Sequence, residues 1–356
     1  MMRILVVTDA WRPQVNGVVH SLLALQKAAA PLGGDIRFLT HRGFATFGLP
    51  TYGEIRLALA PPWRIARRIE RAQADHIHIA TEGTLGLAAR RICLARGIGF
   101  TTSYHTRYPE YVHARTRLPH AVSYAALRAF HNAGGGVMAP TQSMVEDLRA
   151  RGFRNVMLWS RGVDCALFYP RAATLDLPRP IFLYAGRVAV EKNIEAFLSL
   201  DLPGSKLVAG DGPARAQLQA RFPQAHFVGM KTQAELAELY AAADVFVFPS
   251  LTDTFGVVLL EAMASGLPVA AFPAVGPRDV VAAGAGVLSQ DLRAACLAAL
   301  RVPRAAARAH AQAFTWENSA QQFLDNVRCA RAQQNSASFS RSGKASSRAK
   351  ASEGAA

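Results

Sequence analysis

The chain of 356 residues contains only 4 cysteines, and they show no Cys-x-x-Cys pair and no regular spacing. This pattern does not suit a zinc site or a disulfide framework, so we expect reduced core cysteines in a cytosolic protein. No run of about 18 uncharged apolar residues occurs, so no membrane-spanning helix is expected. Asp9 and Arg12 interrupt the apolar run at the start of the chain, which argues against a signal peptide.

Two short motifs are absent as well. No Gly-x-Gly-x-x-Gly occurs, so the sequence does not indicate a dinucleotide-dependent oxidoreductase. No Asp-x-Asp occurs, which fits catalysis in which side-chain cations replace a magnesium ion. His76 and His78 would share one face of a strand, but no third metal ligand has a suitable spacing. The sequence therefore predicts no metal and no cofactor.

Acidic residues are scarce in the first half of the chain. Residues 1–165 hold 21 Lys and Arg against 10 Asp and Glu, whereas residues 166–330 hold 14 of each kind. The last 26 residues add 5 basic against 1 acidic side chain, and the whole chain has a formal net charge of +15. This distribution predicts an anionic partner for the first half of the protein.

Two segments concentrate the basic charge. Residues 63–71 form a basic helical pattern with Ile65 and Ile69 on one side, and residues 107–117 interleave aromatic and basic side chains. Both would suit an anionic membrane surface, where each cation contributes about 1 kcal/mol. An ordinary surface helix of an arginine-rich protein explains either segment alone equally well.

Strand patterns alternate with helical patterns in both halves, which predicts two doubly wound α/β domains. We place the first domain at residues 1–165 and the second at residues 166–315, with a proline-stiffened linker near the boundary. A last helix over residues 316–330 carries an apolar stripe. Residues 331–356, rich in Ser, Ala, Arg and Lys, are predicted to be disordered.

The most informative segment is residues 244–266. A buried strand pattern ends at Pro249, and a helical pattern follows Gly256. A strand, a short loop and a helix start place free backbone N–H groups beside Asp253 and Glu261, which suits a ligand with both phosphate and sugar hydroxyls. In the alternative, Asp253 or Thr254 only caps the helix and Glu261 is a solvated surface acid.

A second motif lies at residues 184–193. A strand pattern ends at Ala185, Gly186 permits a turn, and Arg187 and Lys192 follow before a helical pattern. A forked guanidinium and a point charge together suit a diphosphate. In the alternative, both cations are solvated surface groups.

Together the two motifs resemble the donor-binding half of the retaining glycosyltransferases of sequence family four, which includes sucrose synthases, sulfolipid synthases and bacterial α-mannosyltransferases. The resemblance covers about residues 2–330. It implies the GT-B fold: two Rossmann-like parallel-sheet domains that face a cleft, with a C-terminal helix crossing back to the first domain. The ligand that it implies is a nucleotide-diphosphate sugar.

The resemblance also implies roles for individual residues. Arg187 and Lys192 would hold the diphosphate, and Asp253 and Glu261 would hold the sugar and the ribose. Asp253 departs from the family pattern, which most often has Glu there. The remaining residues expected to bind the donor are Gly229, which follows a strand, and the helix start at Phe255, Gly256 and Val257.

The first half adds two candidates through the same resemblance. Gly17, at a predicted helix start, would admit the donor close to the backbone. His105, after the strand pattern at residues 100–103, would approach the transferred sugar. A histidine that only caps the strand explains the residue equally well when it is taken alone. Glu82 is a weak candidate for contact with the acceptor.

These features predict transfer of a hexosyl unit with retention of configuration, with His105, Arg187, Lys192 and Asp253 as the catalytic residues. The resemblance implies that no protein nucleophile is needed, because the leaving phosphate takes the proton of the acceptor. GDP-mannose is the first donor expected, and a UDP-hexose or UDP-hexuronic acid the second. The stretch at residues 159–164 also resembles sulfolipid synthases and α-mannosyltransferases, so the expected acceptor is a lipid or glycolipid at the cytoplasmic face of the membrane.

Two other functions remain open. A nucleotide-sugar isomerase or hydrolase on the same fold would bind the donor and need no acceptor. A nucleic-acid-binding protein would explain the pI of about 10.3, but it predicts neither of the two motifs. We therefore expect no nucleic-acid partner.

Overall fold

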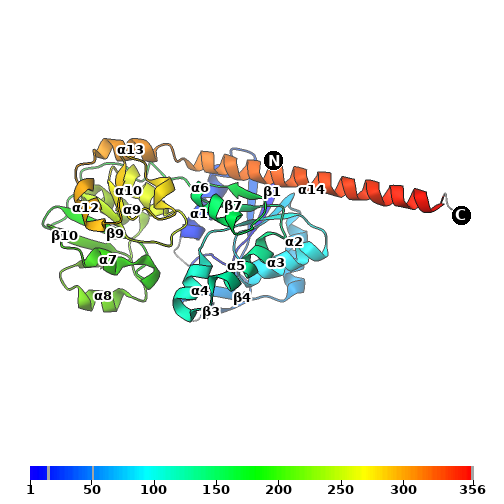
Figure 1. Cartoon of the computed structure of the whole chain (residues 1–356), viewed down its shortest axis with the longest axis horizontal. Coiled ribbons are helices and arrows are strands. Elements are labelled where there is room, and N and C mark those ends of the chain that lie inside the picture. The colour runs from blue at the N-terminus through cyan, green and yellow to red at the C-terminus, as the bar shows by residue number, and fades with distance from the viewer. Residues whose placement is uncertain (14–16, 50–51, 354–356) are drawn as a thin grey trace.

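The structure is a computed structural model that describes residues 1–13, 17–49 and 52–353. Two α/β bodies lie side by side, and one long helix runs along the first of them (Figure 1). Each body has a six-stranded sheet in which all neighbouring strands are parallel. This confirms the prediction of two Rossmann-like domains.

The first sheet has the strand order β2-β1-β5-β6-β7-β8. Its strands are β1 (Met2–Val7), β2 (Gly34–Leu39), β5 (His76–Ile79), β6 (Phe100–Ser103), β7 (Val137–Ala139) and β8 (Val156–Leu158). Its helices are α1 (Gly17–Ala29), α2 (Pro62–Ala72), α3 (Thr84–Ala95), α4 (Tyr108–Thr116), α5 (His120–His131) and α6 (Gln142–Ala150). An antiparallel hairpin, β3 (Ala45–Leu49) and β4 (Tyr52–Leu59), stands apart from the sheet.

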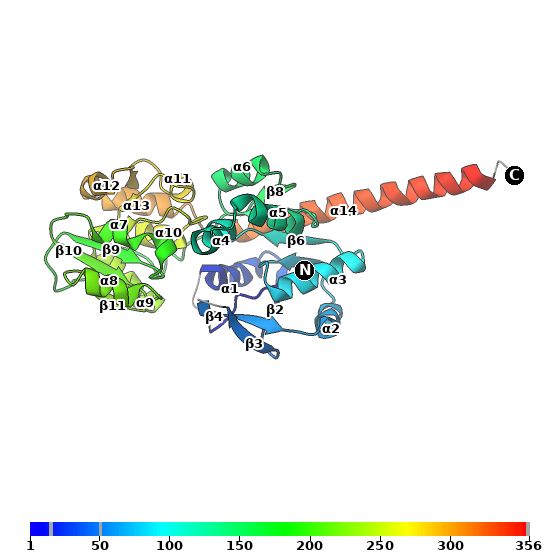
Figure 2. The same ribbon diagram turned by 60° about the horizontal axis from the view of Figure 1, so that its bottom comes forward.

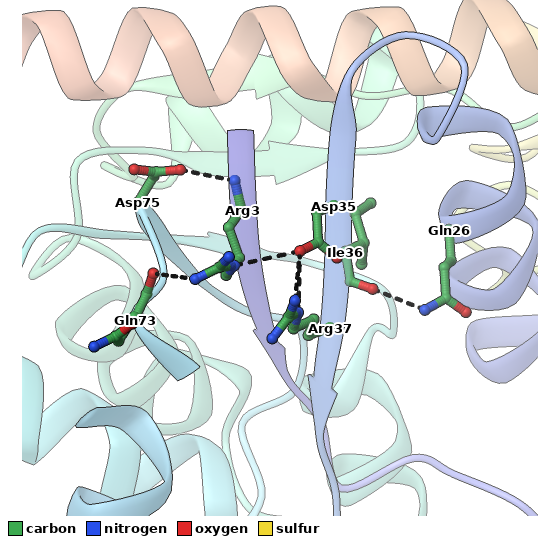
Figure 3. Close-up of polar contacts among 7 residues, drawn as sticks. All are labelled: Arg3, Gln26, Asp35, Ile36, Arg37, Gln73 and Asp75. Carbon is green, nitrogen blue, oxygen red and sulfur yellow. Dashed lines mark hydrogen bonds and ion pairs between the residues drawn. The ribbon is translucent and has the colours of Figure 1, made fainter. Parts of the chain in front are cut away.

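Side chains near the amino ends of β1 and β2 form a polar cluster (Figure 3). The guanidinium of Arg3 donates to Asp35 Oδ2 at 3.3 Å and to the carbonyl of Gln73 at 3.3 Å. Asp35 Oδ2 also accepts from Arg37 Nε at 3.0 Å, and the backbone N–H of Arg3 donates to Asp75 Oδ2 at 2.8 Å. These contacts hold the amino ends of β1 and β2 together, at the end of the sheet opposite to the carboxyl ends of its strands.

The second sheet has the order β11-β10-β9-β12-β13-β14. Its strands are β9 (Ile181–Ala185), β10 (Ser205–Ala209), β11 (His226–Gly229), β12 (Val245–Phe248), β13 (Val269–Ala271) and β14 (Gly286–Leu288). Its helices are the 3-10 turn η1 (Val190–Lys192), α7 (Ile194–Leu198), α8 (Arg215–Arg221), α9 (Gln233–Ala242), α10 (Val257–Ala264), α11 (Pro277–Val280), α12 (Leu292–Ala299) and α13 (Arg304–Ala311).

In this second sheet the strand order reverses between β9 and β12. From β9 the chain builds outward through β10 and β11, then returns to the other side of β9 with β12. Ligands of open α/β sheets bind outside the carboxyl ends of the strands at such a reversal. The two motifs of the second domain follow β9 and β12, so the fold brings them to one place.

The last helix, α14 (Trp316–Glu353), returns to the first domain. Trp316, Ala320, Phe323, Leu324 and Val327 are buried in one apolar cluster with residues of β1 and α1. This burial confirms the predicted crossing of the C-terminal helix and its apolar stripe. Figures 1 and 2 show α14 continuing past the first domain.

The structure differs from the prediction of a disordered tail over residues 331–356, because α14 continues as one helix to Glu353. The extension contains no proline, and a helix that is already formed extends at little cost through residues such as Ala, Arg, Lys and Gln. The last three residues lie outside the described part of the chain.

Two further expectations are met only in part. All four cysteines are free, but only Cys93 and Cys296 are buried, whereas Cys329 is exposed. The basic segment 107–117 forms α4, yet Arg107 points inward and pairs with Glu110 at 2.8 Å. Within residues 1–13, 17–49 and 52–353, none of the helices combines the length and the apolar character needed to cross a lipid bilayer.

Candidate active site

The turn after β9 is built against the turn after β10. Gly186 and Gly210 have φ of +149° and +139°, and a Cβ on Gly210 would lie 1.8 Å from the carbonyl oxygen of Gly186. A side chain at Gly210 would therefore push the two turns apart. Arg187 follows directly, half-buried, and its carbonyl accepts from the Tyr184 hydroxyl at 2.8 Å. The packed turns hold Arg187 at the carboxyl end of β9, as the sequence predicted.

Lys192 and Asp253 form an ion pair across the two loops, with Lys192 Nζ 2.5 Å from Asp253 Oδ1. Burial alone would lower the pKa of the Lys192 ammonium, but the surrounding charges, foremost that of Asp253, raise it above its usual value. Lys192 is thus charged at any physiological pH. Both side chains are less than one fifth exposed, so Lys192 is not the solvated surface cation of the alternative interpretation.

Two further bonds connect these loops. Asn193 Nδ2 donates to the carbonyl of Pro249 at 3.1 Å, and Thr252 Oγ1 donates to the carbonyl of Glu191 at 3.1 Å. Asp253 Oδ2 is buried without a hydrogen-bond partner among the described residues. A buried carboxylate oxygen of this kind is costly unless a donor reaches it, and sugar hydroxyls are suitable donors.

The helix that follows, α10, begins without a side-chain cap. Its N-cap residue is Gly256, with φ +85°. The alternative in which Asp253 or Thr254 caps this helix is therefore wrong. Phe255 is 5% exposed in the apolar core, so only its backbone is available to a ligand, and Val257 opens the helix half-buried.

Glu261 lies on the inner face of α10 and is 6% exposed, so it is not a surface acid. Its Oε2 accepts from the Tyr240 hydroxyl at 3.2 Å. Burial raises the pKa of Glu261 to about 7, and the Tyr240 hydrogen bond opposes this shift. A half-ionised carboxyl near neutral pH can accept hydrogen bonds from ribose hydroxyls.

His105 extends from the carboxyl end of β6 and meets the second domain. Its backbone carbonyl accepts from Thr254 Oγ1 at 2.7 Å. Its ring Nδ1 lies 3.1 Å from Arg161 Nη2, and its Nε2 is buried without a partner among the described residues. The structure therefore places His105 beside the loop that carries Asp253.

The two predicted glycines differ in their surroundings. Gly17 is the exposed first residue of α1, and a Cβ there would meet nothing within 4 Å. The loop residues 14–16 before it lie outside the described residues. Gly229 is buried at the end of β11, where its carbonyl accepts from Gly210 N at 2.8 Å. Gly229 thus supports the turn after β10.

Two residues near this site were missed by sequence reasoning. Arg161 is buried beside His105. Tyr111 of α4 lies close enough to Lys192 and Asp253 for their charges to act on its hydroxyl, whose pKa is raised mainly by burial. Both lie in segments that the sequence singled out for other reasons, residues 159–164 and 107–117, and only contacts across the fold connect them with this site.

Glu82 is engaged inside the first domain. Its Oε1 lies 3.1 Å from His131 Nε2, and the other ring nitrogen of His131 contacts Thr102 Oγ1 at 2.8 Å. His76 and His78 both contact Thr101 Oγ1 at 2.9 Å, which confirms that they share a face of the strand. In the part of the chain that the structure describes, no three His, Cys, Asp or Glu side chains are grouped to hold a metal ion.

Comparison with known families gives two matches that divide the chain as the two sheets do. Residues 15–167 match the family described as "Glycosyltransferase Family 4", and residues 179–314 match "Glycosyl transferases group 1".

Individual proteins agree with these families. The chain is 31% identical over 307 residues to a GDP-mannose-dependent alpha-mannosyltransferase of Mycobacterium tuberculosis, covering 79% of this chain and 81% of that protein. It is 33% identical over 258 residues to sulfoquinovosyl transferase SQD2 of Arabidopsis thaliana, covering 67% of this chain but only 50% of the plant protein. Among solved structures, sucrose-phosphate synthase from Thermosynechococcus elongatus superposes with a TM-score of 0.73 at 21% identity, over 94% of this chain and all of that one.

Proposed function

Because this chain belongs to the family-four glycosyltransferases of the GT-B type, we propose that it transfers a hexosyl unit, with retention of configuration, from a nucleotide-diphosphate sugar to a lipid or glycolipid. GDP-mannose is the first donor proposed, and a UDP-hexose or UDP-hexuronic acid the second. The observation that carries this proposal is the Lys192–Asp253 pair together with the hydrogen bond from Thr254, the residue after Asp253, to the carbonyl of His105 in the first domain.

The charges at this junction suit departure of a nucleoside diphosphate. Negative charge grows on the diphosphate as the bond to the sugar breaks, and Lys192 together with Arg187 would stabilise it. Free N–H groups at the start of α10 add the favourable end of the helix dipole. These cations take the place of a metal ion in the proposal, so transfer should persist in excess EDTA.

The carboxylates would position the sugar and the nucleoside. Asp253 Oδ2 would accept from sugar hydroxyls, and Glu261 from the ribose. The phosphate oxygen released on the same face of the sugar would take the proton of the acceptor hydroxyl, so the protein supplies no nucleophile.

A lipid acceptor is supported by the relatives and by α2. Similar proteins include alpha-monoglucosyldiacylglycerol synthase of Streptococcus pneumoniae, at 29% identity over 315 residues. In α2, Trp63 is 60% exposed, and Arg64, Arg67 and Arg71 are exposed around it. We propose that this helix contacts anionic lipid at the cytoplasmic face of the membrane.

The donor site is tested by thermal unfolding with GDP, UDP, ADP and their sugar conjugates. We expect one nucleotide to stabilise the protein, by about 2.7 kcal/mol at 100 times its dissociation constant. Arg187→Ala and Glu261→Ala should abolish the shift. Arg221→Ala is the control, because Arg221 is a half-exposed residue of the same domain that pairs with Glu195.

Absence of a shift with every nucleotide, on a protein that unfolds cooperatively, would contradict the proposal. Transfer itself is then measured with the stabilising sugar nucleotide and vesicles that contain diacylglycerol or phosphatidylinositol. The anomeric proton coupling of the glycolipid product reports retention or inversion.

A further inference from the structure

Arg161 is a buried cation that has no acidic partner in the described part of the chain. It lies just after β8, where the chain leaves the first domain, and is 4% exposed. Its Nη1 donates to the carbonyls of Trp159 at 2.5 Å and Ser160 at 3.0 Å, and its guanidinium stacks 4.1 Å from the Trp159 ring. Among the described residues no carboxylate forms an ion pair with it. Burying an unpaired charge is costly, so its position calls for a reason beyond packing.

The same guanidinium determines which ring nitrogen of His105 carries the proton. Its Nη2 lies 3.1 Å from His105 Nδ1, and a guanidinium can only donate. Nδ1 must therefore accept, and the proton of the neutral ring stays on Nε2. Burial first, then the charges of Arg161, His78 and His131, hold the pKa of His105 well below its usual value, so the ring is neutral near pH 7.

Within the described ranges, the resulting Nε2–H has no acceptor. Nε2 of His105 is buried and unpartnered among the described residues, although the backbone carbonyl of the same residue accepts a hydrogen bond from Thr254 Oγ1. Leaving a buried donor unpaired is costly, and a ligand oxygen would offset that cost. The unpaired donor belongs to a residue that contacts the loop carrying Asp253.

Helix α14 fixes the groups that hold Arg161. The Trp159 indole Nε1 donates to Ser319 Oγ at 3.2 Å, and Ser319 Oγ donates to the carbonyl of Ser160 at 2.8 Å. The backbone N–H of Ser160 donates to Gln322 Oε1 at 2.7 Å. Because the Ser160 carbonyl and the Trp159 ring, which both contact Arg161, belong to this network, the direction of the guanidinium is set by the crossing helix.

We propose that Arg161 is a positioning residue for sugar transfer: it keeps the His105 proton on Nε2, so that Nε2–H donates to an oxygen of the transferred sugar. The sugar oxygen in this statement rests on the proposed function, whereas the position of the proton does not. Arg161→Lys would keep the positive charge but lose the forked guanidinium, which donates to His105 and to the two carbonyls at the same time.

The first test needs no substrate. Long-range proton–nitrogen spectra of protein labelled with ¹⁵N-histidine distinguish protonated from unprotonated ring nitrogens, and the signal lost in His105→Gln assigns His105. In the wild type we expect Nε2 protonated and Nδ1 unprotonated from pH 5.5 to 8. In Arg161→Met we expect Nδ1 to gain a proton as the pH falls.

Two results would overturn the proposal: a protonated Nδ1 in the wild type, which needs no variant to fold, or identical His105 spectra in the wild type and Arg161→Met. Arg304→Met is the matched control, because Arg304 also donates to two backbone carbonyls, those of Ala243 and Ala241, but in the second domain. It should leave the His105 signals unchanged.

The second test measures transfer from the stabilising sugar nucleotide. Arg161→Met should lower kcat by about 10- to 100-fold with little change in the donor KM, and Arg161→Lys should recover part of the loss. Equal losses in Arg161→Met and Arg304→Met would point to a structural role only and contradict the proposal. If the spectra are as expected but no donor is used, the proposed function fails while the control of the His105 proton stands.

Discussion

Burial places the protonation of Glu261 in the physiological range. The pKa of this carboxyl rises from 4.5 to about 7 on folding. Since the folded protein holds the proton more tightly than the unfolded chain, the contribution of Glu261 to stability falls as the pH rises from 4.5 to 7 and stays constant above that. The residue is kept at a cost to stability, as expected of a group retained for binding.

We therefore predict opposite effects of Glu261→Gln on stability and binding. At pH 8 the variant should be more stable by about 1–3 kcal/mol, and the gain should shrink toward pH 5, where the wild-type carboxyl is protonated. Its affinity for the stabilising nucleotide should fall roughly tenfold at pH 8, because a charge-assisted hydrogen bond is lost. Unfolding curves and calorimetric titrations at pH 5, 6.5 and 8 measure both, and a gain in stability independent of pH would contradict this account.

At this scale the sequence predicted which residues lie in the loops after β9 and β12 better than it predicted their partners. Arg187, Lys192 and Glu261 could be found because each belongs to a motif that lies beside or within a recognisable strand or helix pattern. The pairing of Lys192 with Asp253 and the contact of Arg161 with His105 join residues 61 and 56 positions apart. Such pairs depend on how strands are ordered in space, which a single sequence does not encode locally.

At the scale of elements, the start of α10 depends on one backbone conformation. Gly256 has φ +85°, and a Cβ there would lie 2.9 Å from Leu259 Cδ1 and 3.1 Å from Phe248 Cζ. An alanine would add both conformational strain and crowding. The N–H groups of the helix start, which are proposed to face the diphosphate, would shift with it.

We predict that Gly256→Ala destabilises the protein by about 2–4 kcal/mol and weakens nucleotide binding. Gly284→Ala is the matched control, since Gly284 also has a positive φ, +90°, but a Cβ there meets nothing within 4 Å. Its cost should be limited to about 1–2 kcal/mol of strain, with binding unchanged. Chemical unfolding and nucleotide titration of both variants measure the difference, and equal costs would show that crowding plays no part.

The elements themselves were largely predictable, because the buried strands and the helix starts have clear periodicity. The main difference concerns α14, where composition suggested disorder beyond residue 330 and the structure extends the helix to Glu353. Composition describes an isolated segment, whereas this one continues a helix whose first turns are packed on the first domain.

At the scale of the whole molecule, most of the net positive charge lies in the first domain. Arg64 and Arg68 of α2 stack on Phe44 with their guanidinium carbons 5.1 and 4.3 Å from the ring centre. Figures 1 and 2 show α2 on the part of the first domain that lies away from the second. A surface contacted through α2 would thus leave the second domain free to bind the donor.

We predict that changing Arg64, Arg67, Arg68 and Arg71 to Gln lowers binding to vesicles containing phosphatidylglycerol by more than about tenfold. Binding of the wild type should weaken with salt and be small on phosphatidylcholine alone. The control changes four arginines of the second domain to Gln: Arg215, Arg221, Arg293 and Arg301. Co-sedimentation measures binding, and similar losses in both variants would show that the contact is not localised to α2.

The two crossings between the domains run side by side. The backbone N–H of Val163 donates to the carbonyl of Phe314 at 3.0 Å, and a Cβ on Gly162 would lie 2.4 Å from the backbone nitrogen of Trp316. Any rotation of one domain against the other must therefore occur about these two adjacent connections. Atoms near a rotation axis move least, so His105, which is hydrogen-bonded to Arg161 beside these connections, would move very little. The loop that carries Thr254 would move with the second domain. Such a movement would have to break the hydrogen bond from Thr254 Oγ1 to the His105 carbonyl.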